Sequence, residues 1–478
     1  MAELEPVIGL EIHVQLKTRT KLFCGNLNEF GAEPNVHVCP VCLGLPGALP
    51  VLNRQAVELG VRAALGLHCT VHQRSIFARK NYFYPDLPKG YQISQFEQPF
   101  ATDGFVEVPD ESEGTTRRIR IRRIHLEEDA GKSLHDRIPA ATAVDLNRTG
   151  VPLIEIVTEP DVRSPREARE FLNRLKRALE YLEVSDCNME EGSLRVDANV
   201  SVRRPGEGLG TKTEVKNMNS FSNVERALVY EIDRQCRLRE RGEPVVHETL
   251  LWDAAKGEAR PMRSKEESHD YRYFPDPDLP PVEIAADWLE AIRESVPEMP
   301  WTRAARFEES FALSAEHATQ LTATREVADY FEAIVAAGSD PADAASWVMG
   351  EVLAAVNNAR TTLADFPVRP PALAELLALV RSGRISRPIA RQVFATTLES
   401  GRSPAAIVEE QGLAQVTDAR TLEGWVDQAI DAAPGEAERF RGGERKLMGF
   451  FVGQVMKLSG GKADPKQISR LLQEKLQS

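Results

Sequence analysis

The segment IGLEIHVQL, residues 8–16, has an aliphatic side chain at every even position and a polar or small one at every odd position. Because successive side chains of a β-strand point to opposite faces of a sheet, this pattern predicts a strand with Glu11, His13 and Gln15 on one face. A second segment, RVDANVSV at residues 195–202, repeats the alternation. Its polar positions are Arg195, Asp197, Asn199 and Ser201. We expect the two polar faces to form one floor, although an exposed sheet face without function would show the same pattern.

Carboxylates gather in two further segments. VPLIEIV, residues 151–157, is apolar on both faces except at Glu155, so this carboxylate is expected to be buried or to lie at the rim of a site. Upstream, an arginine-bearing strand leads into Glu127, Glu128 and Asp129. Since Mg²⁺ prefers carboxylate and water oxygens, Glu11, His13, Glu127, Glu128 and Glu155 form a candidate ligand set for Mg²⁺ and phosphate. A structural ion pair at Glu155 and a solvated acidic helix start at 127–129 are the alternatives.

The segment NYFYPDLPKGYQISQ, residues 81–95, interleaves aromatic residues, a lysine and amides around turn residues. A nucleotide or the end of a tRNA could stack there, with Lys89, Tyr91, Gln92 and Ser94 as candidate contacts. A loop whose tyrosines fix it to the core explains the segment equally well. The chain has no Walker lysine loop and no GxGxxG after a strand, so an ATP site would be of an uncommon kind.

The length and composition indicate a modular globular protein. At 478 residues the chain is long for one hydrophobic core, and no apolar run approaches the roughly 18 residues that cross a bilayer. The N-terminus lacks the pattern of an export signal and the six cysteines are too few for a disulfide framework, so we expect a cytoplasmic protein without a membrane contact. The net charge of −13 argues against non-specific coating of nucleic acid but allows a local basic face.

The chain changes character along its length. Mixed strands and helices precede the segment DYRYFPDPDLPP, residues 270–281, whose prolines predict a surface strap or linker without regular structure. Alanine-rich helical patterns follow. We therefore predict an α+β fold: a mixed-sheet domain at 1–295, an all-helical domain at 296–407 and a small helical tail domain at 408–478. Helix starts are predicted at Ser164, Ser222, Ser386 and Ser403, and at Asp464-Pro465.

Several of these segments together resemble the B subunit of the tRNA-dependent amidotransferases. They are VIGLEIHVQL, FGAEPN, VCPVCLGLPGALPVLN, RKNYFYPDLPKGYQISQ, HLEEDAGK, VDLNRTGVPLIEIVTEPD, MEEGSLRVDANVSV, TEVKNMNSF and DYRYFPDPDLPP, and GFFVGQVMKLSGGKADPKQISRLLQEKL is similar to the family's C-terminal tail. The resemblance covers essentially the whole chain. It implies a cradle-shaped kinase domain, a helical domain and a tail that holds the tRNA.

The resemblance also implies a reaction and partners. The A subunit, an amidase, would release ammonia from glutamine, and the small C subunit would brace the heterotrimer. This chain would use ATP to phosphorylate the side-chain carboxylate of Asp-tRNA(Asn) or Glu-tRNA(Gln) before ammonia displaces the phosphate. The implied Mg²⁺ ligands are Glu11, His13, Glu128 and Glu155, with Glu127 as the other member of the acidic pair. The implied substrate or nucleotide contacts are Lys89, Tyr91, Gln92, Ser94, Arg195, Asp197, Asn199 and Lys216, and the implied tRNA contacts of the tail are Lys457, Lys462, Lys466 and Arg470.

In one place the chain departs from the family pattern. Cys24, Cys39 and Cys42 resemble the family's zinc loop, but many members have another cysteine two residues after the first, where this chain has Asn26. Since structural zinc takes four ligands and only His37 is a local substitute, we expect zinc to be bound substoichiometrically. Two other functions stay open at this point: a tRNA-binding scaffold without catalysis, and a free-standing amide ligase for small molecules.

Overall fold

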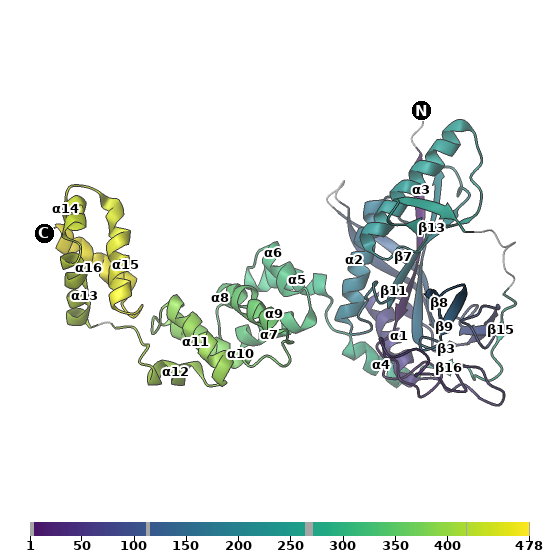
Figure 1. The fold of residues 1–478 in the computed structure, drawn as a ribbon, viewed down its shortest axis with the longest axis horizontal. Helices are drawn as coiled ribbons and strands as arrows, with labels where there is room; N and C mark the ends of the chain where they lie inside the picture. The colour runs from purple at the N-terminus through teal and green to yellow at the C-terminus, as the bar shows by residue number, and fades with distance from the viewer. Residues whose placement is uncertain (1–3, 111–114, 263–270, 417, 478) are drawn as a thin grey trace. The chain divides into compact units, whose positions relative to one another are not determined.

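The computed structural model describes residues 4–110, 115–262, 271–416 and 418–477. The chain divides into two compact units, Met1–Met299 and Pro300–Ser478 (Figure 1). The first unit contains a large mixed sheet and several helices, whereas the described part of the second unit is built from helices and their connections. This composition confirms the predicted α+β class with a helical C-terminal part.

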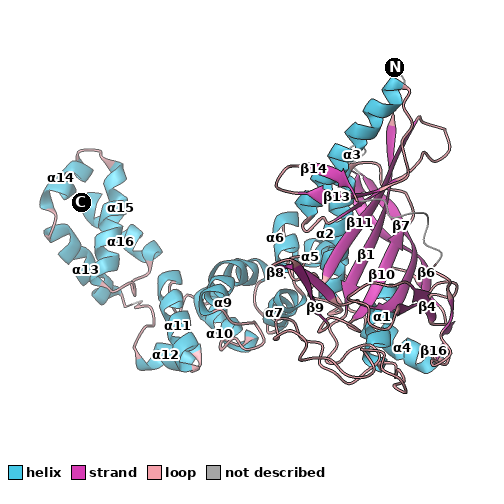
Figure 2. Cartoon of the chain, turned by 45° about the vertical axis from the view of Figure 1, so that its right-hand side comes forward, coloured by secondary structure: helices cyan, strands magenta, loops and turns pink. Residues whose placement is uncertain are grey.

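Nine strands form the large sheet of the first unit (Figure 2). In spatial order they are β14 (Glu258–Pro261), β13 (Thr249–Asp253), β12 (Thr213–Lys216), β11 (Leu194–Arg203), β1 (Glu5–Gln15), β10 (Pro152–Thr158), β7 (Thr115–Glu128), β6 (Ala101–Asp110) and β2 (Thr70–Val71). Neighbouring strands are antiparallel except for the parallel pair β12 and β13. The two segments predicted to share a floor, at 8–16 and 195–202, are therefore adjacent strands, β1 and β11.

Helices cover the apolar face of this sheet. They are α1 (Arg54–Gly66), α2 (Pro165–Tyr181) and α3 (Phe221–Arg241), and α4 (Ala286–Ser295) packs on α1. A Cβ atom added at Gly60 of α1 would lie 3.5 Å from Leu126 and 3.6 Å from Ile154, so the helix lies directly on these two strands. Leu126 and Ile154 are paired across β7 and β10, and their polar neighbours in sequence therefore point to the opposite face.

Two helix starts illustrate the local sequence signals. Ser164 caps α2 as predicted, with its side chain accepting the N–H of Glu167 at 3.1 Å. The predicted start at Ser222 was wrong: α3 begins at Phe221, and Ser220 is the cap, accepting the N–H of Asn223 at 3.1 Å. The extended backbone of Ser220 lets its hydroxyl reach the first turn.

Three small sheets complete the first unit. They consist of β15 (Phe274–Pro275), β4 (Ala78–Asn81) and β5 (Tyr91–Ser94); of β3 (Arg74–Ser75) and β16 (Val282–Glu283); and of β8 (Lys132–Ile138) and β9 (Ala141–Asp145). The described part of the predicted strap, residues 271–281, lies along β4. Arg79 of β4 holds it through ion pairs to Asp276 at 2.9 Å and Asp278 at 2.7 Å. The prolines do not exclude regular structure here, because Phe274–Pro275 forms an edge strand.

Two apolar clusters hold the helices of the second unit. The first cluster runs from Ala304 to Leu413 and the second from Leu422 to Leu476. The helices are α5 (Pro300–Phe311), α6 (Ala315–Leu321), α7 (Arg325–Ala336), α8 (Pro341–Trp347), the π-helix η1 (Val348–Val352), α9 (Leu353–Ala359), α10 (Pro370–Arg381), α11 (Arg387–Ser400), α12 (Pro404–Glu410), α13 (Ala419–Asp431), α14 (Pro434–Arg441), the 3₁₀-helix η2 (Arg445–Leu447), α15 (Met448–Leu458) and α16 (Pro465–Gln477).

The predicted helix starts in this unit are confirmed. Ser386 precedes α11, which ends at Gly401 in the left-handed conformation, Ser403 caps α12, and α16 begins at Pro465. The predicted boundary at 407/408 falls within α12, whose Ile407 and Val408 belong to the first cluster. Among the described residues, no helix combines the length and apolar character required to cross a membrane.

Candidate active site

The register of the large sheet places polar residues from four strands on one face. His13 of β1 is paired with Glu155 of β10 and with Arg195 of β11, and Glu155 is paired in turn with His125 of β7. Directly paired residues share a face, as do residues two apart in a strand. We call this face the polar floor; it comprises Glu11, His13, Gln15, His125, Glu127, Glu155, Arg195, Asp197 and Asn199. The floor predicted from the alternation of the two segments is thus present.

Two carboxylates and two imidazoles meet at the centre of the floor. His13 Nε2 lies 3.5 Å from Glu127 Oε1 and 3.7 Å from Glu155 Oε2. His125 Nε2 lies 3.1 Å from Glu155 Oε2 and 3.7 Å from Glu127 Oε2. We call these four residues the carboxylate–imidazole cluster. Ligand atoms of His13, Glu127 and Glu155 all lie within 4.8 Å of one another, close enough to share one cation.

The cluster is mostly buried but open on one side. The side chains of His125 and Glu127 are each 3% exposed, whereas that of His13 is 21% exposed. Nδ1 of His125 is buried and has no hydrogen-bond partner among the described residues. Burial lowers the pKa of His125, but the adjacent Glu155 and Glu127 outweigh burial and raise it above its ordinary value. The imidazole therefore lies in a strongly anionic environment.

A lysine from the small three-stranded sheet adds positive charge near the cluster. Burial lowers the pKa of Lys80, and the opposing effects of Glu127, Tyr273 and Glu155 raise it above its ordinary value. Its ammonium lies 4.8 Å from the ring centre of Tyr271, in the strap. Ser94 of β5 donates to Glu127 Oε2 at 3.3 Å. The segments 78–94 and 271–273 thus contribute side chains to the same site as the large sheet.

The remaining floor residues form a polar row along β1, β11 and β12. Asn199 Nδ2 donates to Glu11 Oε1 at 2.9 Å, and Lys216 pairs with Asp197 at 2.8 Å. Arg195 pairs with Asp129 Oδ2 at 2.9 Å, and Gln15 donates to the same oxygen at 3.1 Å. Glu11, Asp197, Asn199, Arg195 and Lys216, all selected from the sequence, therefore lie on one surface, although Glu11 is not among the three residues whose ligand atoms converge.

Glu128 is not part of this site. Because neighbouring residues of a strand point to opposite faces, Glu127 faces the floor and Glu128 faces the other way. Glu128 pairs with the buried Lys89 and accepts the N–H of Ile93 at 2.9 Å, while Gln92 Nε2 donates to its carbonyl oxygen at 2.7 Å. Lys89 also lies 5.2 Å from the ring centre of Tyr91. Lys89, Tyr91 and Gln92 thus surround Glu128, and Glu127 takes the place beside His13 that the resemblance had assigned to Glu128.

Sequence reasoning did not select His125 or Lys80. His125 could have been found, because it lies two residues before Glu127 in a predicted strand and must share its face. Lys80 precedes the aromatic segment, and only the pairing of β4 with β5 and β15 explains its proximity to the two glutamates. No local pattern marks it.

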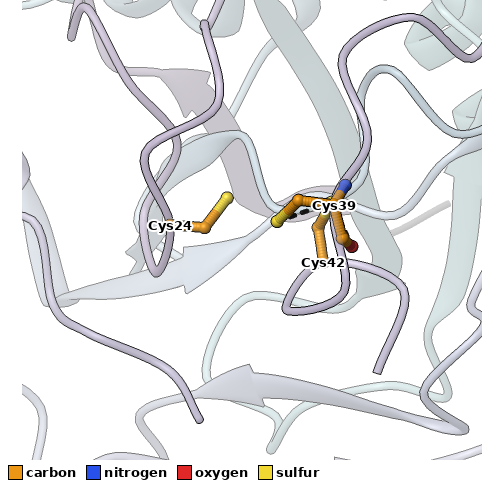
Figure 3. Close-up of side chains that lie close together, drawn as sticks. All are labelled: Cys24, Cys39 and Cys42. Carbon is orange, nitrogen blue, oxygen red and sulfur yellow. Dashed lines mark hydrogen bonds between the residues drawn. The ribbon is translucent and has the colours of Figure 1, made fainter. Parts of the chain in front are cut away.

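The other predicted sites lie elsewhere. The sulfur atoms of Cys24, Cys39 and Cys42 lie within 4.8 Å of one another (Figure 3). In the second unit, Lys457 lies in the last turn of α15, Lys466 and Arg470 lie on α16, and all three are exposed, whereas Lys462 is half-buried in the connection between the two helices. Arg470 also pairs with Glu474 at 3.0 Å within α16.

Comparison with known protein families agrees with this architecture. Residues 6–290 match the family described as the GatB/GatE catalytic domain, and residues 329–476 match the GatB domain. The chain belongs to the GatB family. The catalytic-domain match of this GatB chain includes every residue of the polar floor, and the second match includes the basic residues of α15 and α16.

Three full-length relatives share one name, which designates the B subunit of aspartyl/glutamyl-tRNA(Asn/Gln) amidotransferase. The protein from Carboxydothermus hydrogenoformans is 51% identical, over 100% of this chain and 99% of its own length. Those from Geotalea daltonii and Geobacter sulfurreducens are 52% and 53% identical, each over 99% of this chain and over 100% and 99% of their own lengths. The similarity therefore extends through both units.

Proposed function

We propose that this chain uses ATP to phosphorylate the side-chain carboxylate of Asp-tRNA(Asn), Glu-tRNA(Gln) or both, and then converts the acyl phosphate to the amide with ammonia. The observation that carries the proposal is the carboxylate–imidazole cluster, in which Glu127, Glu155 and His13 converge at the open side of the polar floor. The names of the relatives supply the substrate class, misacylated tRNA.

The chemistry requires an activation step. A carboxylate is a poor electrophile, because its resonance-stabilised charge repels a nucleophile and oxide is not a leaving group. In the proposed reaction a side-chain carboxylate oxygen attacks the γ-phosphorus of ATP and ADP leaves. The nitrogen of ammonia then attacks the acyl carbon, phosphate leaves with the former carboxylate oxygen, and the nitrogen loses a proton. Both steps place negative charge on phosphate oxygens, which needs compensation by cations.

The donor set fits Mg²⁺. Carboxylate oxygens are the ligands that this ion prefers, and Glu127 and Glu155 present them within 4.8 Å of each other and of His13. We propose that these three residues hold the ion, with Glu11 further along the same strand face. When bound, Mg²⁺ would neutralise phosphate charge and orient the transferred group.

The chain's own cations have separate roles. Lys80, whose charge acts on Glu127 and Glu155, would pair with the anionic phosphate or with the substrate carboxylate. Arg195, anchored by Asp129, and Lys216, anchored by Asp197, extend this positive charge along the floor. Such fixed cations stabilise developing charge without reorganising at the moment of reaction. Ser94 of β5, which donates to Glu127, is a proposed nucleotide contact at the floor, whereas Lys89, Tyr91 and Gln92 surround Glu128.

Partners supply what the chain lacks. We propose a heterotrimer in which the A subunit, an amidase, releases ammonia from glutamine and the small C subunit braces the assembly, because the sequence contains no evident glutaminase motif. Lys457, Lys462, Lys466 and Arg470 would hold tRNA phosphates. The name shared by the relatives, which designates one component of an amidotransferase, supports this division of labour.

The experiment is an ATP-hydrolysis and amidation assay of the reconstituted heterotrimer on both mischarged tRNAs. ATP turnover that rises with mischarged tRNA and falls with Glu127→Gln supports the proposal. Good tRNA binding without stimulated ATP turnover would identify a scaffold protein instead. Equal turnover with free aspartate or glutamate would indicate a small-molecule amide ligase. The matched variant Glu128→Gln changes the neighbouring carboxylate on the opposite face and serves as the control.

A further inference from the structure

A buried lysine lies within the cysteine loop, away from the polar floor. Cys24, Cys39 and Cys42 converge, with the sulfur atoms of Cys39 and Cys42 3.8 Å apart (Figure 3). Tetrahedral zinc with sulfur at about 2.3 Å separates its sulfur ligands by about 3.8 Å, so this spacing alone is compatible with zinc. Whether zinc binds here therefore depends on a fourth ligand and on the charge around the three thiols. We call these three residues the thiol cluster.

No fourth zinc ligand joins the thiol cluster among the described residues. His37, the local substitute expected from the sequence, has Nε2 3.7 Å from Glu29 Oε2 and does not belong to the convergent group. Asn26 stands where many relatives were expected to have a cysteine, and its side-chain amide lies 3.7 Å from the sulfur of Cys42. Asparagine is not among the side chains that zinc ordinarily takes as ligands, which are cysteine, histidine and carboxylates. The donor set thus does not fit four-coordinate zinc.

Lys21 already supplies a cation at this place. Its side chain is fully buried, its ammonium donates to the carbonyl oxygen of His37 at 2.6 Å and lies 4.0 Å from the sulfur of Cys42. Burial lowers the pKa of Lys21 below its ordinary value, and the opposing effects of Cys42, Cys24 and Cys39 offset burial only in part. Glu128, a carboxylate that also acts on Lys21, is paired with Lys89. The thiols are therefore the groups left to compensate the buried charge.

Three N–H donors converge on one sulfur atom. The backbone N–H of Cys39 lies 3.1 Å from Cys42 Sγ, in addition to the Asn26 amide and the Lys21 ammonium. We propose that Lys21 is the cation of the thiol cluster, and that Lys21, Asn26 and the Cys39 amide hold Cys42 and its loop in place of zinc. Two features of the chain oppose zinc binding: the ammonium of Lys21 repels a divalent cation, and the loop offers no fourth ligand.

The test is the metal content of the full-length protein purified from zinc-supplemented medium and dialysed against a chelator. The wild-type chain should retain clearly less than one zinc per chain. Asn26→Cys, which adds a fourth thiol, should retain about one. Gly25→Cys is the matched control: apart from its two chain neighbours, a Cβ atom there meets nothing within 4 Å, so the variant adds a thiol to the same loop without displacing other residues. One chelator-resistant zinc in the wild type would overturn the proposal, as would equal zinc in the two cysteine variants.

A second variant tests Lys21 itself. In the Asn26→Cys background, Lys21→Met should raise zinc affinity by about tenfold or more, because a competing cation is removed from the same sulfur atoms. Competition with a chromophoric chelator measures this affinity and requires no enzymatic activity. An unchanged zinc affinity would show that the Lys21 ammonium does not compete with zinc for the sulfur atoms. The proposal would then fail even if the wild-type chain bound no zinc.

Discussion

Nε2 of His125 lies 3.1 Å from Oε2 of Glu155, directly across the antiparallel strands β7 and β10. This pair closes the carboxylate–imidazole cluster on its buried side, while His13 borders its open side. An imidazole that fixes a carboxylate in this way limits the rotamers of the ligand and should keep it aimed at the ion or substrate.

Replacing His125 should disturb this positioning without removing a proposed ligand. We expect His125→Asn to lower kcat for amidation by about 10–100-fold and to weaken Mg²⁺ activation, the usual effect of losing a group that orients a ligand. Amidation measured over a range of Mg²⁺ concentrations checks this. A variant with wild-type kcat and Mg²⁺ dependence would show that His125 does not orient Glu155.

The neighbouring glutamates should behave differently. Glu127→Gln should lower amidation by about 100-fold or more, because it removes a charge from the proposed phosphoryl-transfer site. Glu128→Gln should retain amidation within about tenfold but lower the free energy of unfolding by about 3–5 kcal/mol, since Lys89 is left buried without a counter-charge. Parallel assays and denaturant titrations of both variants separate the effects, and a loss of catalysis confined to Glu128→Gln would reverse the assignment.

Glu11 and His13 extend the same test along β1. We expect Glu11→Gln and His13→Ala to abolish tRNA-dependent amidation while glutamine hydrolysis in the assembled complex continues at least in part. Glu107→Gln, which changes an exposed acid paired with Arg118 on β6 and β7, is the control and should be neutral. Wild-type amidation by either floor variant at limiting Mg²⁺ would remove that residue from the proposed site.

The basic residues of the tail should determine how tRNA binding depends on salt. Neutralising Lys457, Lys462, Lys466 and Arg470 should lower the slope of log K against log salt by about one unit for each phosphate contact that is removed. Lys475→Gln is a suitable control, because Lys475 pairs with Asp427 at 2.6 Å within the tail. Direct binding of tRNA at several salt concentrations gives the slope. If all four substitutions leave it unchanged, this surface does not hold the RNA.

The ion pairs of Glu332 with Arg303 and Arg306 should make the stability of the helical unit depend on pH. Burial raises the pKa of Glu332, but hydrogen bonds and charges from Arg306 and Arg303 outweigh burial and lower it below the ordinary glutamate value. The stabilisation is therefore present above the unfolded-state pKa and is lost as pH falls through the lower folded-state pKa. Glu332→Gln should cost about 1–3 kcal/mol near neutral pH and flatten the acid dependence, as seen by hydrogen exchange in α5 and α7. Glu309→Gln, at an exposed site of α5, should do neither.

The sequence predicted most of the floor, because period-two alternation decides which side chains share a face without any knowledge of the partner strand. It predicted Glu11, His13, Arg195, Asp197 and Asn199 in this way, and it predicted the unusual position of Glu155 from a single carboxylate in an apolar strand. It did not decide between Glu127 and Glu128, although the alternation of Ile124 and Leu126 with His125 and Glu127 places Glu127 on the polar face of its strand.

Long-range pairing explains the remaining differences. Lys80 reaches the cluster only because β4, β5 and the strap segment assemble into a sheet from residues far apart in sequence. Lys21 lies in the cysteine loop with no sequence feature that predicts burial of an ammonium beside thiols. The wrong helix start at Ser222 has a local cause. Ser220 and Ser222 can both serve as caps by residue type, and the extended backbone of Ser220 makes it the cap.

We propose that the side-chain carboxylate of the aminoacyl-tRNA is phosphorylated at the polar floor. It can be tested with mischarged tRNA labelled with ¹⁸O in that carboxylate, the reconstituted heterotrimer, ATP and glutamine. We predict that each amide formed releases one inorganic phosphate containing one ¹⁸O atom, and that Glu127→Gln abolishes this release while Glu128→Gln permits it. Amide formation with phosphate free of ¹⁸O would rule out an acyl-phosphate intermediate, because the oxygen lost from the carboxylate would then not have been bonded to phosphorus.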